Sequence, residues 1–396
     1  MQHISRRHIL SIGLAIFSMF FGAGNLMYPI LVGMTSGSNN IFGMLGFLIT
    51  AVLLPVMGLL AMILFNGNYE AFFHRLGKGT GNFFIFACMM IIGPIIAIPR
   101  IVTLSHTMIA PFMPFEIIRD TTSLFGSCFF AIIFLGITFL ATFRENRIVD
   151  VLGNVISPLL LLSLIVIITK GIFSAEYIVP TLQTPLDAFK TNMVVGYETL
   201  DLLGAIFFSS IMLHILHNTL GGNVGHNKRT LAIIGLKAGG IGLSLLGIVY
   251  IGLSILGMYH GHGLMDANAG ELFREIAFKV LGSGGALVIA TAVLMACLST
   301  SIALAAVVGE FTQRTIFRNK IGYVPALIIT LAACMPLSIF GLGQVLALTA
   351  GPVVYVGYPL IITITLCNLA YKAVGFSWIK LPVFLTFLLA LVSYLM

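Results

Sequence analysis

The stretch FSMFFGAGNLMYP, residues 17–29, decides the fold. It lies in the first apolar run of the chain, where an unbroken helix is expected, yet it carries Gly22, Gly24, Asn25 and Pro29. Glycine costs a helix about 1 kcal/mol relative to alanine, and in lipid every backbone group that a helix releases needs another partner. Such an interruption is tolerated where it lines a polar cavity. The combination of these glycines with Asn25 and Pro29 therefore predicts a broken helix here. The alternative is a continuous helix whose glycines only let a neighbouring helix approach closely.

The composition is that of a membrane protein. Of the 396 residues, 59% are hydrophobic and 8% are charged, which leaves too few charges to cover a soluble domain of this size. Apolar runs of roughly 20 residues recur along the chain, and each can cross ~30 Å of hydrocarbon as a helix. The sequence therefore predicts an all-α, polytopic membrane protein with a single domain, 1–396, and about eleven transmembrane helices. The expected spans are 9–33, 41–65, 82–110, 123–143, 151–172, 194–219, 230–258, 284–308, 321–341, 344–369 and 377–395.

The charges indicate how the chain is oriented rather than a charged partner. The net charge is +7, but the basic residues lie in short loops between apolar runs, so we expect no nucleic acid partner. A cytoplasmic N-terminus places most lysines and arginines on the cytoplasmic side, as the positive-inside rule requires. The segment LGKGTGN, residues 76–82, lacks the spacer and the hydroxyl residue of a phosphate-binding loop, so ATP-driven pumping has no support.

A broken helix supplies backbone groups that can bind ions and substrates. The half that begins after the break presents free N–H groups and the positive end of its dipole to an anion, whereas the half that ends before it offers carbonyl oxygens to a cation. This arrangement suits a zwitterionic amino acid together with a small cation. An inverted repeat predicts a second broken helix in the sixth span, which contains GYETLDLLGAIFFSSIMLHILHNTLGG, residues 196–222.

The sixth span carries ionisable residues that a lipid-facing helix would avoid. Glu198 and Asp201 lie in its outer part, and the nearest candidate partner by depth is Arg100 in the third span. We predict a gate pair between Arg100 and Asp201 or Glu198. His214 and His217 share one helix face, but no carboxylate or cysteine accompanies them at metal-ligand spacing, so packing is the expected role.

The eighth span contains MACLSTS, residues 295–301, with adjacent hydroxyl residues in an apolar helix. Ser299 and Thr300, with the backbone carbonyl of Ala296, could form part of a site for a hard cation. The alternative is that each hydroxyl donates to a carbonyl of its own helix, which is common in membranes.

These motifs together resemble the bacterial branched-chain amino acid transport system II carriers, a family of cation symporters. The resemblance covers nearly the whole chain. Its motifs are F-F-G-A-G-N-L-x-x-P at 20–29, G-P-x-x-A-x-P-R at 93–100, G-Y-x-T-x-D at 196–201, A-C-L-S-T at 296–300 and Tyr358-Pro359. The family threonine is a serine at Ser299, and the chain has about one span fewer than is usual in the family.

The resemblance implies a fold and a set of binding residues. Carriers of this family belong to the leucine-transporter-like superfamily, which implies a five-plus-five inverted repeat with helices one and six broken. Repeat one is expected at about 9–172 and repeat two at about 194–369, followed by an extra helix at about 377–395. By analogy, the coupling cation would be held by Ser18, Phe21, Ala296, Ser299 and Thr300. The substrate would be bound by Gly22, Ala23, Gly24 and Asn25, and by Phe207, Phe208, Ser209 and Ser210.

The resemblance also implies the function. We expect a secondary active symporter of the bacterial inner membrane that imports leucine, isoleucine and valine with sodium, or with protons, by alternating access. No cofactor is expected, and the oligomeric state stays open. One alternative is a proton-coupled carrier of another small neutral amino acid such as methionine, because an apolar pocket discriminates poorly between similar side chains. An integral-membrane enzyme would need clustered carboxylates, a metal set or an activated nucleophile, and the sequence assembles none of these, so we expect no enzyme.

Overall fold

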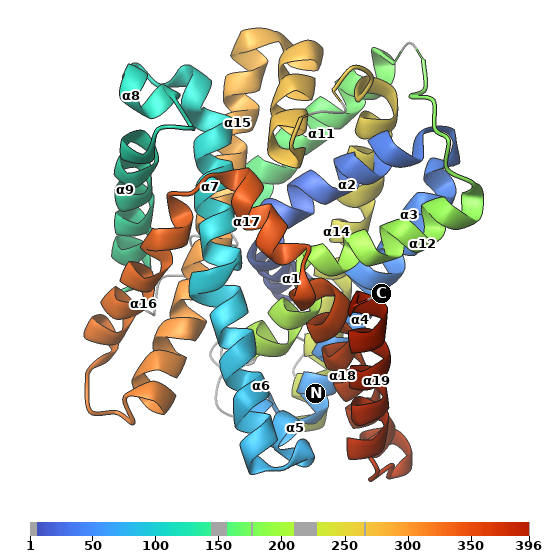
Figure 1. Ribbon diagram of the computed structural model, residues 1–396, viewed down its shortest axis with the longest axis vertical. Coiled ribbons are helices and arrows are strands. Elements are labelled where there is room, and N and C mark those ends of the chain that lie inside the picture. Colours follow the sequence, from blue (N-terminus) through green and yellow to red (C-terminus); the bar gives the residue numbers. More distant parts are fainter. Residues whose placement is uncertain (1–5, 144–156, 176, 210–227, 265–266, 396) are drawn as a thin grey trace.

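The computed structural model describes residues 6–143, 157–175, 177–209, 228–264 and 267–395. All regular secondary structure of these residues is helical, and no strand occurs among them, which confirms the all-α prediction (Figure 1). The α-helices are α1 (Arg6–Phe20), α2 (Ala23–Ser36), α3 (Asn40–Leu48), α4 (Leu54–Leu64), α5 (Tyr69–Phe73), α6 (Lys78–Met90), α7 (Ala97–Ile109), α8 (Glu116–Arg119), α9 (Leu124–Thr142), α11 (Ser157–Phe173), α12 (Pro185–Val195), α14 (Lys228–His260), α15 (Ala269–Phe311), α16 (Tyr323–Ser338), α17 (Leu342–Thr349), α18 (Tyr358–Val374) and α19 (Lys380–Leu395).

The helices form a bundle that presents apolar side chains outward. In the described part of the chain, six helices are long and apolar enough to cross a membrane, and four shorter apolar helices accompany them. A soluble protein would not leave a large apolar surface in water, so this surface faces lipid. Exposed apolar side chains on α9 and α19 include Leu124, Phe125, Leu140, Phe384 and Leu389.

The first crossing is broken at the predicted glycines. Helix α1 ends at Phe20 and α2 begins at Ala23, and Gly22 between them is extended, with φ −110° and ψ −161°. Pro29 does not end the helix, because α2 continues through it to Ser36. The break therefore depends on the glycine segment and not on the proline.

The sixth crossing is also interrupted, but it begins earlier than predicted. Helix α12 leads into a 3₁₀ turn, η8 (Gly196–Thr199), then Leu200 is left-handed with φ 64°, and residues 201–209 are helical again. The segment between the expected fifth and sixth spans, residues 173–193, is helical in its second half, where α12 begins at Pro185. Thr184 caps α12 by accepting from the Asp187 amide at 3.2 Å, and Pro185 suits the first helical turn.

The two breaks lie together in the interior of the bundle. Helix α2 packs against both α12 and η8, although these segments are far apart in the sequence. In Figure 1, α1 lies at the centre of the bundle, and α2 and α12 both extend from the centre towards the right. Helix α7 and the long arm of α15 enclose the same region, since α15 packs against α1, α2 and α7.

Helix α15 is bent at Gly282, whose φ of 73° few other residues could adopt. The short arm, residues 269–281, buries Leu272, Phe273 and Ile276. Its Arg274 donates to the Thr107 carbonyl of α7 at 3.4 Å, so the arm covers the end of α7.

Candidate substrate and ion site

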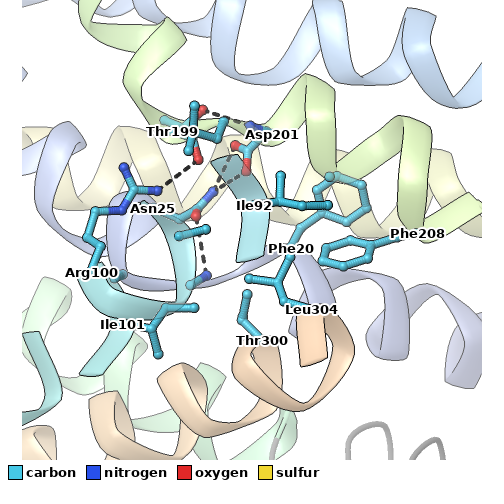
Figure 2. A pocket seen from close by; sticks show the side chains of 15 residues that line it. Phe20, Asn25, Ile92, Arg100, Ile101, Thr199, Asp201, Phe208, Thr300 and Leu304 are labelled. Carbon is cyan, nitrogen blue, oxygen red and sulfur yellow. Dashed lines mark hydrogen bonds between the residues drawn. The ribbon is translucent and has the colours of Figure 1, made fainter. Parts of the chain in front are cut away.

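A small cavity lies where the two breaks meet. Its volume is about 40 Å³, whereas pockets that hold a ligand usually measure ~300–1,000 Å³. The walls must therefore separate before a molecule as large as an amino acid can enter. The lining residues are Phe20, Gly22, Ala23, Asn25, Ile92, Ala97, Arg100, Ile101, Thr199, Leu200, Asp201, Gly204, Phe208, Thr300 and Leu304 (Figure 2).

Asn25 connects the two broken helices at the polar end of the cavity. Its Oδ1 accepts from the Gly22 amide at 3.2 Å, and the same amide also donates to the Phe20 carbonyl at 2.8 Å. Its Nδ2 lies 2.9 and 2.8 Å from the two carboxylate oxygens of Asp201 and also contacts the Tyr250 hydroxyl. One side chain thus binds to the first break, the second break and α14.

Asp201 is a buried carboxylate whose hydrogen-bond donors are neutral. Its side chain is 5% exposed, and the Tyr250 hydroxyl donates to it at 2.9 Å in addition to the Asn25 amide. In the part of the chain that the structure describes, Asp201 forms no ion pair. It stands at the start of the helix 201–209, where the helix dipole favours a negative charge.

Arg100 reaches the same break from α7, but it binds backbone oxygens. Its Nη1 donates to the Glu198 carbonyl at 2.6 Å and to the Tyr28 hydroxyl at 3.4 Å, and its Nη2 donates to the Thr199 carbonyl at 3.3 Å. The ion pairs within 4 Å among the described residues are at the protein surface and do not include Arg100. The predicted gate pair of Arg100 with Asp201 or Glu198 is therefore not formed in this conformation.

The other end of the cavity is apolar. Phe208 lies edge-on to Phe20 with 5.7 Å between the ring centroids, and Leu304 and Ile92 lie beside them. Figure 2 shows these side chains across the cavity from Arg100. The cavity is therefore polar at one end and aliphatic or aromatic at the other.

Two other predicted substrate residues of the sixth span, Phe207 and Ser209, do not line the cavity. Phe207 points away from the cavity and packs against Tyr69 and Phe73, with ring centroids at 5.3 and 6.1 Å. Ser209 donates to the Ile206 carbonyl of its own helix at 2.6 Å. Ser210, like His214 and His217, lies outside the described residues.

The structure brings together most of the residues predicted to hold a cation. The Ser299 hydroxyl lies 2.9 Å from the Ser18 carbonyl oxygen, 2.8 Å from the Ala296 carbonyl oxygen and 3.3 Å from the Ser18 hydroxyl. Phe21 is fully buried, and its ring stacks on Phe17 at 5.0 Å. These oxygens bridge α1 and α15 beside the first break.

Thr300 differs from the other hydroxyl residues of this group. It is 7% exposed, and its Oγ1 has no hydrogen-bond partner among the described residues. The hydroxyl lies 3.2 Å from the point that a Cβ on Gly22 would occupy. A buried hydroxyl without a partner is unfavourable unless it binds something, and an oxygen here suits a hard cation. Within the described ranges, no group of three His, Cys, Asp or Glu side chains could hold a transition metal.

Three tyrosines around the second break were not predicted as site residues, although Tyr197 and Tyr358 belong to the sequence motifs. Tyr250 donates to Asp201, and the Tyr358 hydroxyl accepts from the Leu202 amide at 3.0 Å, while Tyr197 stacks on Tyr358 at 5.0 Å. A buried tyrosine hydroxyl usually has a partner, so tyrosines inside apolar helices were the available signal.

The family model described as "Branched-chain amino acid transport protein" matches residues 5–396. The chain belongs to this family. Branched-chain amino acid permease BraB of Bacillus subtilis is 28% identical to it over 367 residues, covering 91% of this chain and 79% of the relative. Branched-chain amino acid permease BrnQ of Escherichia coli is 28% identical over 363 residues, covering 90% and 79%. The branched-chain amino acid transport family is therefore confirmed, and its named relatives are permeases and not enzymes.

Solved structures support the fold alone. MhsT in complex with L-phenylalanine has a TM-score of 0.61 at 16% identity, covering 99% of this chain and 97% of MhsT. A manganese transporter from Eremococcus coleocola has a TM-score of 0.62 at 16% identity, covering 99% and 88%. The predicted leucine-transporter-like fold is thus confirmed for this member of the branched-chain amino acid transport family.

Proposed function

We propose that this protein is a secondary active symporter that imports leucine, isoleucine and valine with sodium by alternating access. The observation that carries the proposal is the cavity between the two breaks, which is polar at one end and apolar at the other. A zwitterionic amino acid with an aliphatic side chain likewise has a charged end and an apolar end. Methionine is a further substrate, because an apolar wall rejects a similar side chain only weakly.

The backbone at the first break suits the carboxylate of the substrate. The amides from Gly22 to Asn25 start α2, and a helix N-terminus attracts an anion through its free N–H groups and its dipole. Phe20, Phe208 and Leu304 then suit the branched side chain, since apolar contact stabilises it without fixing one exact shape.

The oxygens between α1 and α15 suit sodium. Ser18 and Ser299 already contact each other. The Thr300 hydroxyl, which has no hydrogen-bond partner within the described ranges, supplies another oxygen close to Gly22. A cation here would attract α1 and α15 to each other and would shift the packing of the bundle, which is how ion binding would favour one conformation. We retain the predicted placement in the bacterial inner membrane with a cytoplasmic N-terminus.

Proton coupling is the second candidate, and one observation favours it. Asp201 is a buried carboxylate among neutral donors beside the cavity, and such a group in a membrane protein can carry a proton. A proton gradient alone would then drive leucine accumulation. Asp201→Asn would abolish this accumulation while leucine exchange continued.

Purified protein in liposomes tests both candidates. Labelled leucine is added outside, with an inward sodium gradient, an inward proton gradient or neither, and liposomes without protein serve as the control. Sodium symport predicts accumulation above equilibrium under the sodium gradient alone. Accumulation under the proton gradient alone would select the second candidate. Equilibration without accumulation would indicate a channel, and a chemically altered solute would indicate an enzyme.

A further inference from the structure

Arg100 is a buried cation that forms no direct ion pair with a carboxylate of the described residues. The carboxylates of Glu198 and Asp201 act on it electrostatically, but neither forms an ion pair with its guanidinium. It is 4% exposed, and its recorded hydrogen bonds go to neutral oxygens of Glu198, Thr199 and Tyr28. Arginine stays charged in proteins, and burying a charge is strongly unfavourable unless an opposite charge accompanies it. The position is therefore suited to an anion that arrives from outside the chain.

One edge of the guanidinium remains available. The Nε–H is buried and has no partner among the described residues, and Nη2 uses only its bond to the Thr199 carbonyl. Nε–H and Nη2–H lie side by side on the same edge of the group. This edge matches the two oxygens of a carboxylate, which bind such a pair of donors with directional, charge-assisted hydrogen bonds.

The guanidinium lies against the start of α2. Its Nη2 is 3.0 Å from the point that a Cβ on Gly24 would occupy, so only glycine leaves this approach open. Gly24 is also in the first turn of α2, whose N-terminus attracts anions. Both Arg100 and the Gly22 segment line the same cavity (Figure 2).

We infer that Arg100 binds the carboxylate of the transported amino acid together with the N-terminus of α2, and that it makes the carrier selective for free α-amino acids. This inference rests on the proposed function. It differs from the gate pair, in which Arg100 would act through Glu198 or Asp201 and would not contact substrate. A substrate analogue that keeps the side chain and the amino group but lacks the carboxylate separates these two roles.

Leucinamide is such an analogue, and binding can be measured in detergent without any ion gradient. Displacement of labelled leucine by leucine and by leucinamide is compared for the wild type, Arg100→Gln and Arg100→Lys, with Arg274→Gln as a control at the covering arm. We expect Arg100→Gln to weaken leucine binding by ~10- to 150-fold, as for a lost charge-assisted hydrogen bond. Leucinamide binding should change less than about threefold, because the amide lacks the charge. Arg100→Lys should keep part of the preference for leucine.

If Arg100→Gln weakens the binding of leucine and of leucinamide by the same factor, so that the ratio of the two affinities is unchanged, the inference is overturned. If Arg100→Gln does not fold, Arg100→Lys decides, because equal losses of leucine and leucinamide in that variant contradict a carboxylate contact. Rescue of transport by Arg100→Glu combined with Glu198→Arg would instead support the gate pair. This result can be interpreted even if transport is not coupled to sodium, because binding is measured without an ion gradient.

Discussion

Removal of one hydroxyl from α15 gives the sharpest test of the proposed sodium site. Ser299→Ala deletes a fully buried Oγ that lies within 3.3 Å of three oxygens of Ser18 and Ala296. A hydrogen-bonding group that faces a charge contributes ~1.5–3 kcal/mol, and each 1.4 kcal/mol changes a binding constant tenfold. We therefore expect the sodium concentration for half-maximal leucine uptake to rise by ~10- to 150-fold.

The assay is leucine uptake by proteoliposomes at increasing external sodium, with choline keeping the ionic strength constant. Maximal uptake at saturating sodium should be largely retained, because Ser299 does not line the cavity. Ser299→Thr keeps an oxygen and should stay close to the wild type.

Ser301→Ala is the matched control. Ser301 is equally buried in α15, but its hydroxyl faces α9, where it lies 3.2 Å from the Thr138 hydroxyl. Ser299→Ala loses two contacts to Ser18 of α1, and Ser301→Ala loses one contact to Thr138 of α9. Each lost hydrogen bond should cost ~0.5–1.5 kcal/mol of stability, so both variants should be measurably less stable. A similar rise in the sodium requirement for Ser301→Ala, or an unchanged requirement for Ser299→Ala, would refute the assignment.

Three further substitutions probe the proposed ion site, the packing of α2 and the apolar end of the cavity. Thr300→Val should raise the sodium requirement for uptake without lowering the unfolding temperature in detergent, because its hydroxyl has no hydrogen-bond partner in the part of the chain that the structure describes. A lower unfolding temperature would contradict this interpretation. Gly33→Ala should lower the unfolding temperature, because its Cβ would lie 1.8 Å from the Ser254 carbonyl oxygen and overpacking costs ~1–3 kcal/mol. Gly136→Ala is the control: its Cβ would have no atom within 4 Å, so the unfolding temperature should not change. Phe208→Ala should weaken competition by leucine more than competition by phenylalanine, since it enlarges the apolar end of the cavity; equal changes would place Phe208 outside the substrate contact.

The first break and the general architecture could be predicted from the sequence. The length of each apolar run determines which segments can cross a bilayer. The glycines beside Asn25 weaken a helix at the position where a polar side chain lies inside the membrane. The adjacent hydroxyls at Ser299 and Thr300 likewise stood out in an apolar helix. Such signals are local features of the sequence, so they can be recognised without knowledge of how the helices pack.

The second break could not be placed as well. Helix α12 carries Asp187, Lys190 and Asn192, and the low hydrophobicity of this half-helix resembles that of a loop. Its Asn192 is nevertheless buried, because the side chain donates to the Ser36 hydroxyl at 2.8 Å. A partner more than a hundred residues away decides the burial, and local composition does not contain that information.

Arg100 shows the same limit for the binding site. Matching charges by depth pointed to the carboxylates of Glu198 and Asp201, but the guanidinium binds carbonyl oxygens that the break at η8 releases. Backbone oxygens become available only where a helix ends, so their positions follow from the fold. Tyr250 escaped notice because an aromatic side chain in an apolar helix is usually ordinary packing.

The amide of Asn25 has a mechanical consequence. Because one planar group serves the Gly22 N–H and the Asp201 carboxylate together, turning it towards a ligand disturbs both interruptions in a single movement. An intermediate conformation in which only one of the two interruptions has rearranged would leave a buried polar atom without its hydrogen-bond partner, at a penalty of ~1–3 kcal/mol. In the proposed symporter, this one side chain would keep such intermediates rare, and little of the ion gradient would then be lost to leakage.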